Sequence, residues 1–339
     1  MFLYRSGGVE NNIRVLYNSL EQFIRIKEQL FKYRMAGVQK MNVSCENNVV
    51  TVDGVKDFRL GQILECGQCF HFDRLGEDVY EVIAYGRAVK MEQMGSVLRI
   101  YGASLEDYDG IWRSYLDMDN DYGLIKESVI NADAALKTAV DEKDGIRILN
   151  QDFFETLISF IISQNKNIPQ IRQCVKNISH RFGDGVIGYN GETFYIFPDV
   201  KKLHDATEDE LRECKVGFRA PYIKNAAEAV YSGTVTRDKL DKLDIENARE
   251  LLMTIKGVGE KVANCVLLFG LGRREAFPVD VWMKRIMEQM YFDGRDTKKT
   301  EIEAFAVKKF GKLGGYAQQY LFDYARTTLF KQDGSSKIK

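Results

Sequence analysis

The spacing of apolar residues changes once along the chain, and this change constrains the fold more than any other feature. From residue 49 to about 102, short segments rich in Val, Ile and Tyr alternate between apolar and polar residues and are separated by glycine-containing turns. From residue 121 onward the spacing is helical almost throughout. Strands and helices do not alternate, which argues against a parallel sheet. The sequence predicts an α+β fold in which a small antiparallel sheet domain precedes a larger helical domain.

The same change of period divides the chain into segments. We expect an N-terminal extension over 1–40, the sheet domain over 41–135, the helical domain over 136–330 with a hairpin at 246–270, and a tail over 331–339. Residues 1–40 carry seven basic and three acidic residues with apolar residues near helical spacing. They fit an amphipathic helix, a targeting or expression segment, or a start codon upstream of a true start at Met41. The predicted helices are 123–140, 152–163, 168–182, 208–214, 219–232, 246–255, 260–270, 280–291, 300–311 and 315–330.

Composition excludes several classes of protein. The 339 residues are 45% hydrophobic and 29% charged, which argues against global disorder. The chain contains no apolar run of 18 residues and no apolar signal core near Met1, so we expect no membrane span and no secretion. The six cysteines are expected to be reduced thiols. We therefore expect an intracellular protein, in the cytoplasm or nucleoid of a prokaryote or the nucleus of a eukaryote.

Charge is distributed unevenly along the chain. The net charge is −1, but residues 256–339 carry 16 Lys and Arg against 10 Asp and Glu, a net charge of +6. The preceding 255 residues carry 32 against 39, a net charge of −7. This pattern suits a protein that touches a polyanion with one face, and an unevenly charged solvated surface is the alternative.

The most informative stretch is a helix, a Gly257-Val258-Gly259 turn and a second helix. Two glycines allow a tight turn and close backbone approach, and the N–H groups at the start of the second helix form a phosphate site. This is the helix-hairpin-helix pattern, which grips a DNA backbone without reading its sequence. The alternative is a plain helical hairpin whose first helix ends in a left-handed glycine cap.

Lys261 and Asp280 are the candidate catalytic pair. Lys261 stands in the first turn of the second helix, where the helix dipole disfavours its charged form, and a neutral amine is a nucleophile. Cys265 lies one turn later on the same face. The connection 271–279 is long enough to return Asp280 to this neighbourhood. The alternatives are a phosphate-binding or solvated lysine and an aspartate that only caps the next helix.

Together these residues resemble the 8-oxoguanine DNA glycosylases of the helix-hairpin-helix class. Five separated motifs, in the family's order, span about residues 49–330 and carry the resemblance. They are Cys66-Gly67-Gln68-Cys69-Phe70, the run IRILNQDFFETLISFIISQNKN over 146–167, Gly217-Phe218-Arg219-Ala220, GVG-x-K-V-A-x-C with P-V-D, and Gly315-Tyr316-Ala317-Gln318 with Leu321-Phe322. The helical domain is thereby expected to be a helix-hairpin-helix glycosylase domain.

The resemblance implies how the lesion base is handled. Lys261 would attack the sugar and hold it as a Schiff base, while Asp280 would stabilise the developing positive charge. The base must leave the duplex for this chemistry. Cys265 and Phe322 would sandwich it, and Gln318 would bond its pairing edge. The carbonyl of Gly67 would accept the N–H that oxidised guanine has and guanine lacks.

The resemblance also implies contacts to the rest of the duplex. Asn165 and Arg219 would fill the gap and read the opposite cytosine, with Phe218 wedging the stack. Trp282 stands where better-known members place a histidine near a phosphate. Gln170 replaces an arginine directed at the opposite base, and Lys256 replaces a proline of the hairpin. The partner is thus expected to be double-stranded DNA containing 8-oxoguanine, preferentially opposite cytosine, bound by a monomer.

We expect neither a metal nor another cofactor. Cys66 and Cys69 have metal spacing but lack a second pair. No cysteine follows Cys265, so the iron–sulfur cluster of related endonucleases is not expected. The alternating Asp117, Asp119 and Asp121 lack the glycine and glutamate of a calcium loop and are expected to form a solvated loop.

Two other functions remain open at this point. One is a monofunctional helix-hairpin-helix glycosylase for another damaged base, which would need Asp280 without Lys261. The other is a non-catalytic DNA-binding protein that uses the hairpin alone, for which the matches at Gly67, Gln318 and Phe322 would be coincidence.

Overall fold

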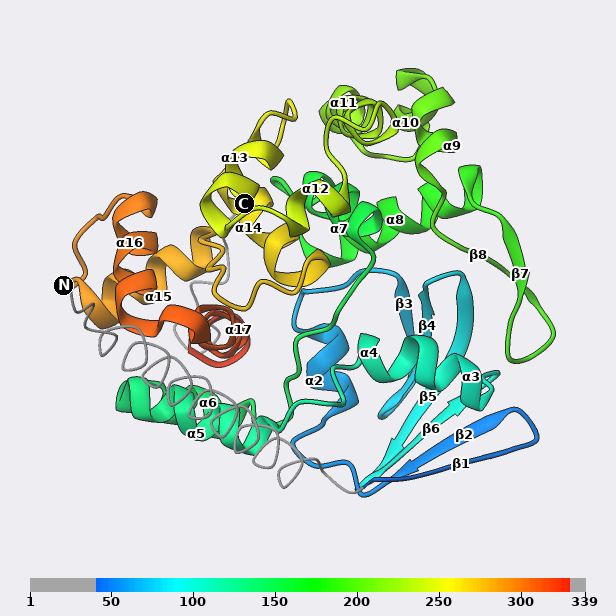
Figure 1. The fold of residues 1–339 in the computed structure, drawn as a ribbon, viewed down its shortest axis with the longest axis horizontal. Coiled ribbons are helices and arrows are strands. Elements are labelled where there is room, and N and C mark those ends of the chain that lie inside the picture. The colour runs from blue at the N-terminus through cyan, green and yellow to red at the C-terminus, as the bar shows by residue number, and fades with distance from the viewer. Residues whose placement is uncertain (1–40, 330–339) are drawn as a thin grey trace, which may run out of the picture.

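A computed structural model describes residues 41–329 (Figure 1). The predicted extension over 1–40 and the tail over 331–339 lie outside the described residues. A sheet at the lower right of Figure 1 is followed by helices that fill the upper and left parts of the molecule. The α+β prediction is confirmed. No helix within residues 41–329 is long and apolar enough to cross a membrane.

Six antiparallel strands form the sheet in the order β1-β2-β6-β5-β4-β3. On its inner face Val50 pairs with Ile100, and Ile100 pairs with Met91, all three fully buried. Trp112, in the helical segment that follows the sheet, is buried in the same core. The strands are β1 (Asn42–Glu46), β2 (Val49–Asp53), β3 (Phe72–Gly76), β4 (Val79–Ala84), β5 (Arg87–Met94) and β6 (Val97–Tyr101), with α2 (Leu60–Glu65) between β2 and β3 and the short α3 (Leu105–Asp107) and α4 (Arg113–Tyr115) after β6.

The helices after residue 121 pack around one buried helix. In α7 (Phe153–Ile162) nine of ten residues are buried, so its neighbours surround it on all sides. The helices of this part are α5 (Tyr122–Ala132), α6 (Lys137–Glu142), α7, α8 (Ile168–Phe182), α9 (Val200–Asp205), α10 (Glu208–Glu213), α11 (Ala220–Tyr231), α12 (Arg237–Asp241), α13 (Ile245–Met253), α14 (Glu260–Cys265), α15 (Val281–Tyr291), α16 (Lys299–Phe310) and α17 (Gly314–Tyr324).

The prediction of one helix over 123–140 is wrong. The helix breaks at Asp133, whose backbone is extended (φ −156°, ψ 110°). The Asp133 carboxylate accepts hydrogen bonds from the Ala135 N–H (3.0 Å) and the Tyr291 hydroxyl (2.7 Å), and pairs with Lys309 at 3.0 Å. Because these bonds favour a capping position over a helix interior, α5 ends there and α6 begins a few residues later.

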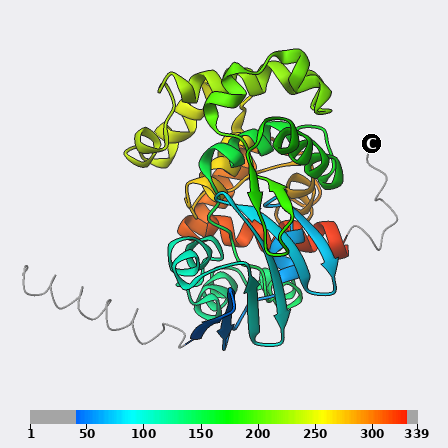
Figure 2. The same cartoon turned by 90° about the vertical axis from the view of Figure 1, so that its right-hand side faces the viewer.

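The region after 121 is also less uniformly helical than its spacing predicts. Strands β7 (Gly185–Ile187) and β8 (Thr193–Tyr195) form a hairpin that Figure 2 shows beside the main sheet. Tyr189 in its loop packs against Gly102, and its hydroxyl donates to Glu81 at 3.4 Å. This hairpin, which the sequence analysis missed, joins the helical part to the sheet.

Candidate active site

The turn between α13 and α14 packs tightly against α11. Gly257 has φ +93°, and a Cβ added to it would lie 2.3 Å from the ring of Tyr222. Glycine is therefore required here both by the backbone and by the space. Val258 is buried, and Gly259 precedes α14 in an extended conformation with no described atom within 4 Å of an added Cβ. The turn therefore closes against the protein at Gly257 and is open at Gly259.

Lys261 is held by the segment that follows α7. Its Nζ donates to Ser163 Oγ at 2.9 Å and lies 4.9 Å from the centre of the Phe160 ring. Ser163 Oγ in turn donates to the Phe160 carbonyl at 2.7 Å, so its lone pairs face the lysine. The amine thus has a fixed direction before any DNA binds.

Asp280 caps α15, as its alternative interpretation predicts. Its carboxylate accepts a hydrogen bond from the Met283 N–H at 2.8 Å. The neighbouring Cys265 is buried, and burial raises the pKa of its thiol to about 11, with the charge of Lys261 opposing and that of Asp280 adding to the rise. Asp280 therefore caps α15 and also stands, like Lys261, near the buried Cys265 thiol.

Lys261 and Asp280 line one open cleft of about 990 Å³. Asn165, Gln170, Gly259 and Trp282 line it too, so the structure brings six of the residues discussed above together. The walls are built from 163–167 with Gln170, from 259–262, from 279–282, and from Lys299 with Glu303.

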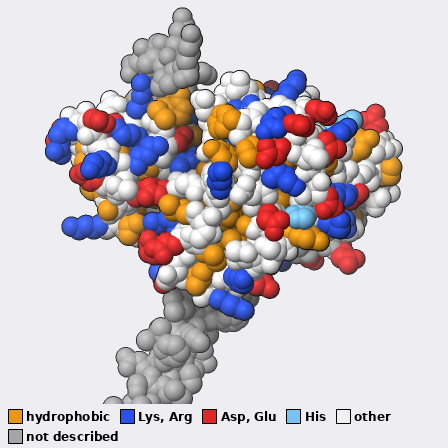
Figure 3. All heavy atoms as spheres, turned by 90° about the horizontal axis from the view of Figure 1, so that it is seen from above, with side chains coloured by type: hydrophobic (Ala, Val, Ile, Leu, Met, Phe, Trp, Pro, Cys, Tyr) orange, Lys and Arg blue, Asp and Glu red, His pale blue; other side chains and the backbone are white. Residues whose placement is uncertain are grey.

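Basic side chains gather near this cleft. Figure 3 shows Lys and Arg concentrated on the left of the face seen from above, the side on which α15 and α16 lie in Figure 1. Arg295, Lys298 and Lys299 are exposed in this region. The positive C-terminal charge noted in the sequence is thus partly collected on one surface, which can attract a polyanion.

Gly67 lies on a separate, apolar side of the site. Its φ is +85°, and an added Cβ would lie 3.1 Å from Ile168 Cδ1 and 3.3 Å from Phe322 Cε1. The turn is fixed by Gln68, which is fully buried and donates to the carbonyls of Ile63 and Arg147, both at 2.8 Å. Among the described residues no group donates to the Gly67 carbonyl itself.

Gln318 and Phe322 come from α17. Gln318 is 5% exposed, and its Oε1 has no hydrogen-bond partner among residues 41–329. A buried acceptor without a donor costs free energy, so such an atom suits a ligand that supplies the donor. The predicted lesion-binding residues Gly67 and Phe322 are close together, since a Cβ added to Gly67 would lie 3.3 Å from Phe322, and Cys265 is buried on α14 four residues after Lys261.

The residues expected at the opposite base are adjacent, but Arg219 is turned inward. It is buried, and its guanidinium donates to the carbonyls of Gln164 (2.9 Å), Val216 (3.0 Å) and Asn165 (3.3 Å). Asn165 is exposed with φ +52°, and Phe218 is 56% exposed. In this state Arg219 supports the loop that carries Asn165 and does not reach into the cleft.

The Gln170 side chain is also engaged by a neighbouring residue. Its Oε1 accepts from the Asn167 N–H at 3.2 Å, while its own N–H donates to Asn167 Oδ1 at 3.0 Å. This reciprocal capping box starts α8. The sequence analysis had not predicted this use of the side chain.

Sequence reasoning assigned no role to Ser163 or Gln164, although both lie in the quoted 146–167 motif. Ser163 binds Lys261, and Gln164 Nε2 donates to the Gly257 carbonyl at 3.0 Å. Both contacts join residues more than 90 positions apart, so only the match to the motif, and no local pattern, could have pointed to them.

The residues considered as metal ligands form other structures. Cys66 and Cys69 are buried free thiols, and burial raises the pKa of Cys66 to about 12. The expectation of a solvated loop is wrong for Asp117, which is buried and accepts from the Tyr122 hydroxyl at 2.8 Å. Within residues 41–329 no group of His, Cys, Asp and Glu is arranged to hold a metal.

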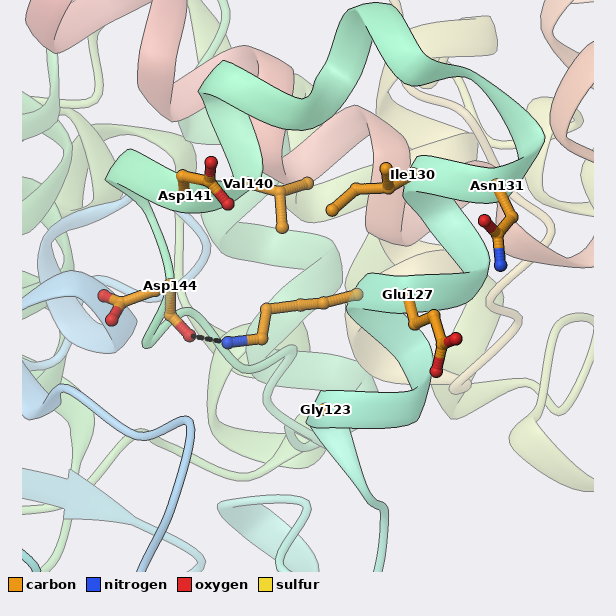
Figure 4. A pocket seen from close by; sticks show the side chains of 8 residues that line it. Gly123, Glu127, Ile130, Asn131, Val140, Asp141 and Asp144 are labelled. Atoms are coloured by element: carbon orange, nitrogen blue, oxygen red, sulfur yellow. Dashed lines mark hydrogen bonds between the residues drawn. The ribbon is translucent and has the colours of Figure 1, made fainter.

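A second hollow, of about 450 Å³, lies between α5 and α6 (Figure 4). Lys126 lines it and donates to the Asp144 carbonyl at 3.1 Å. Its lining contains none of the predicted site residues, so it is separate from the cleft.

Comparison with known proteins identifies the family of the chain. Residues 51–157 match the 8-oxoguanine DNA glycosylase N-terminal domain, and 158–312 match the HhH-GPD superfamily of base excision DNA repair proteins. A probable N-glycosylase/DNA lyase of Methanothermobacter thermautotrophicus is 36% identical over 214 residues, 57% of this chain and 68% of that protein.

Two solved structures are similar over most of their length. A structure of MBOgg1 with a low-affinity DNA ligand has a TM-score of 0.82 at 44% identity, covering 85% of this chain and 98% of that chain. The Clostridium acetobutylicum 8-oxoguanine glycosylase/lyase, in complex with double-stranded DNA containing cytosine opposite 8-oxoguanine, has a TM-score of 0.81 at 40% identity, covering 84% and 97%. The chain therefore belongs to the 8-oxoguanine DNA glycosylase family, within the HhH-GPD superfamily of base excision repair proteins.

Proposed function

We propose that Lys261 is the nucleophile with which this chain, a bifunctional N-glycosylase/DNA lyase of base excision repair, removes 8-oxoguanine. One observation carries the assignment: the Lys261 amine is hydrogen-bonded to Ser163 within the cleft that Asp280 also lines. A solvated lysine would have no such partner. A nucleophile and an anion in one cleft are what a charged sugar intermediate requires.

The steps follow from these two groups. The Lys261 amine attacks the anomeric carbon and forms a C–N bond, the bond to the base breaks as the base leaves with the electron pair, and the proton that the amine loses ends on the departing base. Expulsion of the ring oxygen then gives a Schiff base between Lys261 and the opened sugar. Loss of a proton from the adjacent carbon expels the 3′ phosphate, which nicks the strand. Throughout, the Asp280 carboxylate stabilises the positive charge on the sugar.

Selection of the oxidised base takes place on the apolar side. The Gly67 carbonyl accepts the N–H present only in the oxidised purine, and Gln318 Oε1 accepts from its pairing edge. Cys265 and Phe322 stack on its two faces. The support for these roles is that Phe322 lies next to Gly67 and that Gln318 carries a buried acceptor without a described donor.

The duplex is held by the hairpin and the loop after α7. The N–H groups of Gly257 and Gly259, with Trp282 nearby, contact the backbone of the lesion strand, while the Val258 N–H donates to the Ile255 carbonyl at 3.0 Å and supports the turn. Asn165, Phe218 and Arg219 address the gap and the opposite base, preferentially cytosine, after Arg219 exchanges its carbonyl contacts for the base. The enzyme acts as a monomer.

A single-turnover assay tests the reaction. A duplex with one 8-oxoguanine opposite cytosine is compared with the same duplex carrying guanine. We expect base release and a nick at the lesion only. Base release without a nick would support a monofunctional glycosylase, and binding without either would support a non-catalytic protein.

A further inference from the structure

Gln164 lies between the serine that binds Lys261 and the residue expected at the opposite base. Its side-chain Nε2 donates to the carbonyls of Ile161, at 3.1 Å, and Gly257, at 3.0 Å. A primary amide has two N–H donors, so both are used. The side chain thereby fastens the end of α7 to the hairpin turn.

The backbone of Gln164 is bound from the other direction. Its carbonyl accepts from Arg219 Nε at 2.9 Å and also from Nη2, which in addition reaches the Asn165 carbonyl at 3.3 Å. One residue is thus in contact with the hairpin turn and with a residue expected to read the opposite strand. Its neighbour Ser163 accepts the hydrogen bond from Lys261.

Through these contacts, the position of Arg219 at the opposite base can affect the orientation of Lys261. If Arg219 leaves the Gln164 carbonyl to bind a base, the loop loses three charge-assisted hydrogen bonds and must settle in a new position. Because the Gln164 amide is fixed to the hairpin, that change reaches the segment that orients Lys261. A displacement of about 1 Å at a reacting group can cost about 10²-fold in rate.

We propose that Gln164 is a positioning residue that transmits the identity of the base opposite the lesion to the catalytic lysine. The inference rests on the proposed function and extends it to a residue that lines the cleft but whose side-chain amide bonds two backbone carbonyls of the protein. It requires that the preference for cytosine reside in the rate of excision and not only in binding.

The test uses Gln164→Met, which keeps the length of the side chain and removes both donors. Single-turnover excision is measured with 8-oxoguanine opposite cytosine and opposite adenine, together with Kd for a duplex carrying an uncleavable abasic analogue. We expect the excision rate opposite cytosine to fall about 10- to 100-fold and the rate opposite adenine to fall less than threefold. The Kd for the duplex should change less than threefold. The preference for cytosine should therefore collapse.

Gln173→Met is the matched control, because Gln173 is exposed on α8 and bonds only Asn177 (2.8 Å) among the described residues. It should leave both rates unchanged. If Gln164→Met does not fold, Gln164→Asn, which keeps the amide but is too short to reach both carbonyls, replaces it. Equal loss opposite both bases, or no loss, would overturn the inference alone. Absence of excision or of any cytosine preference in the unaltered protein would overturn its premise.

Discussion

The hairpin side of the active site and the side around Gly67 differ in how their side chains are held. On the hairpin side, Lys261 and Asp280 each have a directed hydrogen bond, at 2.9 and 2.8 Å, and they line an open cleft. On the other side, Gln318 is buried with an unpartnered oxygen among the described residues, and Phe322 packs against Gly67 through carbon atoms.

This difference separates two tasks. Directed hydrogen bonds hold the proposed catalytic groups in place before DNA arrives, and groups held in this way can lower a barrier without reorganisation during the reaction. Contacts between carbon atoms are not directional and can be exchanged for contacts with a flipped base. We therefore expect substitutions on the hairpin side to change the chemical step, and substitutions around Gly67 to change which base is accepted.

The largest expected effect after loss of the nucleophile is that of Asp280→Asn. Asparagine caps a helix as well as aspartate does, so α15 should be retained while the charge is removed. We expect single-turnover excision to fall on the order of 10²–10⁴-fold with little change in DNA binding.

Asp199→Asn is the matched control, because Asp199 caps α9 through the Lys202 N–H at 2.9 Å and does not line the cleft. It should leave excision unchanged. A loss below about threefold in Asp280→Asn would show that Asp280 only caps α15. Lys261 would then be the one remaining catalytic group assigned to the hairpin side.

Gly67→Ala probes the apolar side. A methyl group there would press on Ile168 and Phe322, and the backbone at φ +85° adds a cost of about 1–2 kcal/mol for any other residue. We expect excision to fall about 10- to 100-fold and non-specific DNA binding to change less than threefold, as measured by single-turnover rates and by titration.

Gly95→Ala separates crowding from backbone strain. Gly95 has φ +57°, and no described atom lies within 4 Å of its added Cβ. Both variants should lose stability through backbone strain, with a larger loss in the crowded Gly67→Ala, but only Gly67→Ala should lose excision. Equal excision by Gly67→Ala and the unaltered protein would remove the assigned role of the Gly67 carbonyl.

A smaller effect is expected at Glu303, which lines the catalytic cleft and accepts from Asn264 Nδ2 at 3.2 Å. Burial, reinforced by the charge of Glu260, raises the pKa of Glu303 from 4.5 to about 7. Folding therefore favours the protonated carboxyl, and this contribution to stability, complete below pH 4.5, is lost as the pH rises through 7.

Glu303→Gln should remove the loss of folding stability that occurs as the pH rises through 7. At pH 8.5 we expect the free energy of unfolding to rise by about 1–2 kcal/mol, a value reduced for solvent screening at this partly exposed side chain. At pH 4.5 the difference between the two proteins should be much smaller. Urea unfolding at both pH values decides it, and a pH-independent difference would contradict the assignment.

The smallest expected effect concerns Gln170→Arg, which tests opposite-base reading beside the catalytic groups. Gln170 closes the capping box of α8 and offers no fixed fork of donors to cytosine. We expect the unaltered protein to excise measurably opposite other bases, and Gln170→Arg to sharpen the preference for cytosine about fivefold, part of the 1–3 kcal/mol of a bidentate contact. Strict dependence on cytosine in the unaltered protein would show that Asn165 and Arg219 suffice.

The sequence predicts the elements that carry strong local signals. Helix α8 has the predicted bounds, because Asn167 and Pro169 mark its start and Gly183 follows its end. Strand β1 was missed because all five of its residues are exposed, which removes the alternation that identifies strands. The family, the fold class and the glycosylase/lyase class are confirmed by the comparisons, while the division at residue 135 stays a prediction.

The site is only partly predictable from the sequence, because local signals mark some of its residues and long-range contacts place the others. Lys261, Asp280 and the glycines stand at helix starts and turns, where local rules and motif matches apply. Ser163 and Gln164 act through partners 98 and 93 residues away, and the inward turn of Arg219 depends on carbonyls 54 and 55 residues away. Such contacts arise from tertiary packing and leave no trace in local spacing.

The central claim is that Lys261 forms the covalent bond to the lesion sugar. The most direct measurement is borohydride reduction of the protein mixed with 8-oxoguanine duplex, followed by peptide mapping of the trapped adduct. We predict a covalent protein–DNA species modified at Lys261, and its absence in Lys261→Gln, which should still bind the duplex but excise on the order of 10⁴-fold more slowly or not at all. Undiminished trapping in Lys261→Gln, or modification at another residue, would contradict the account.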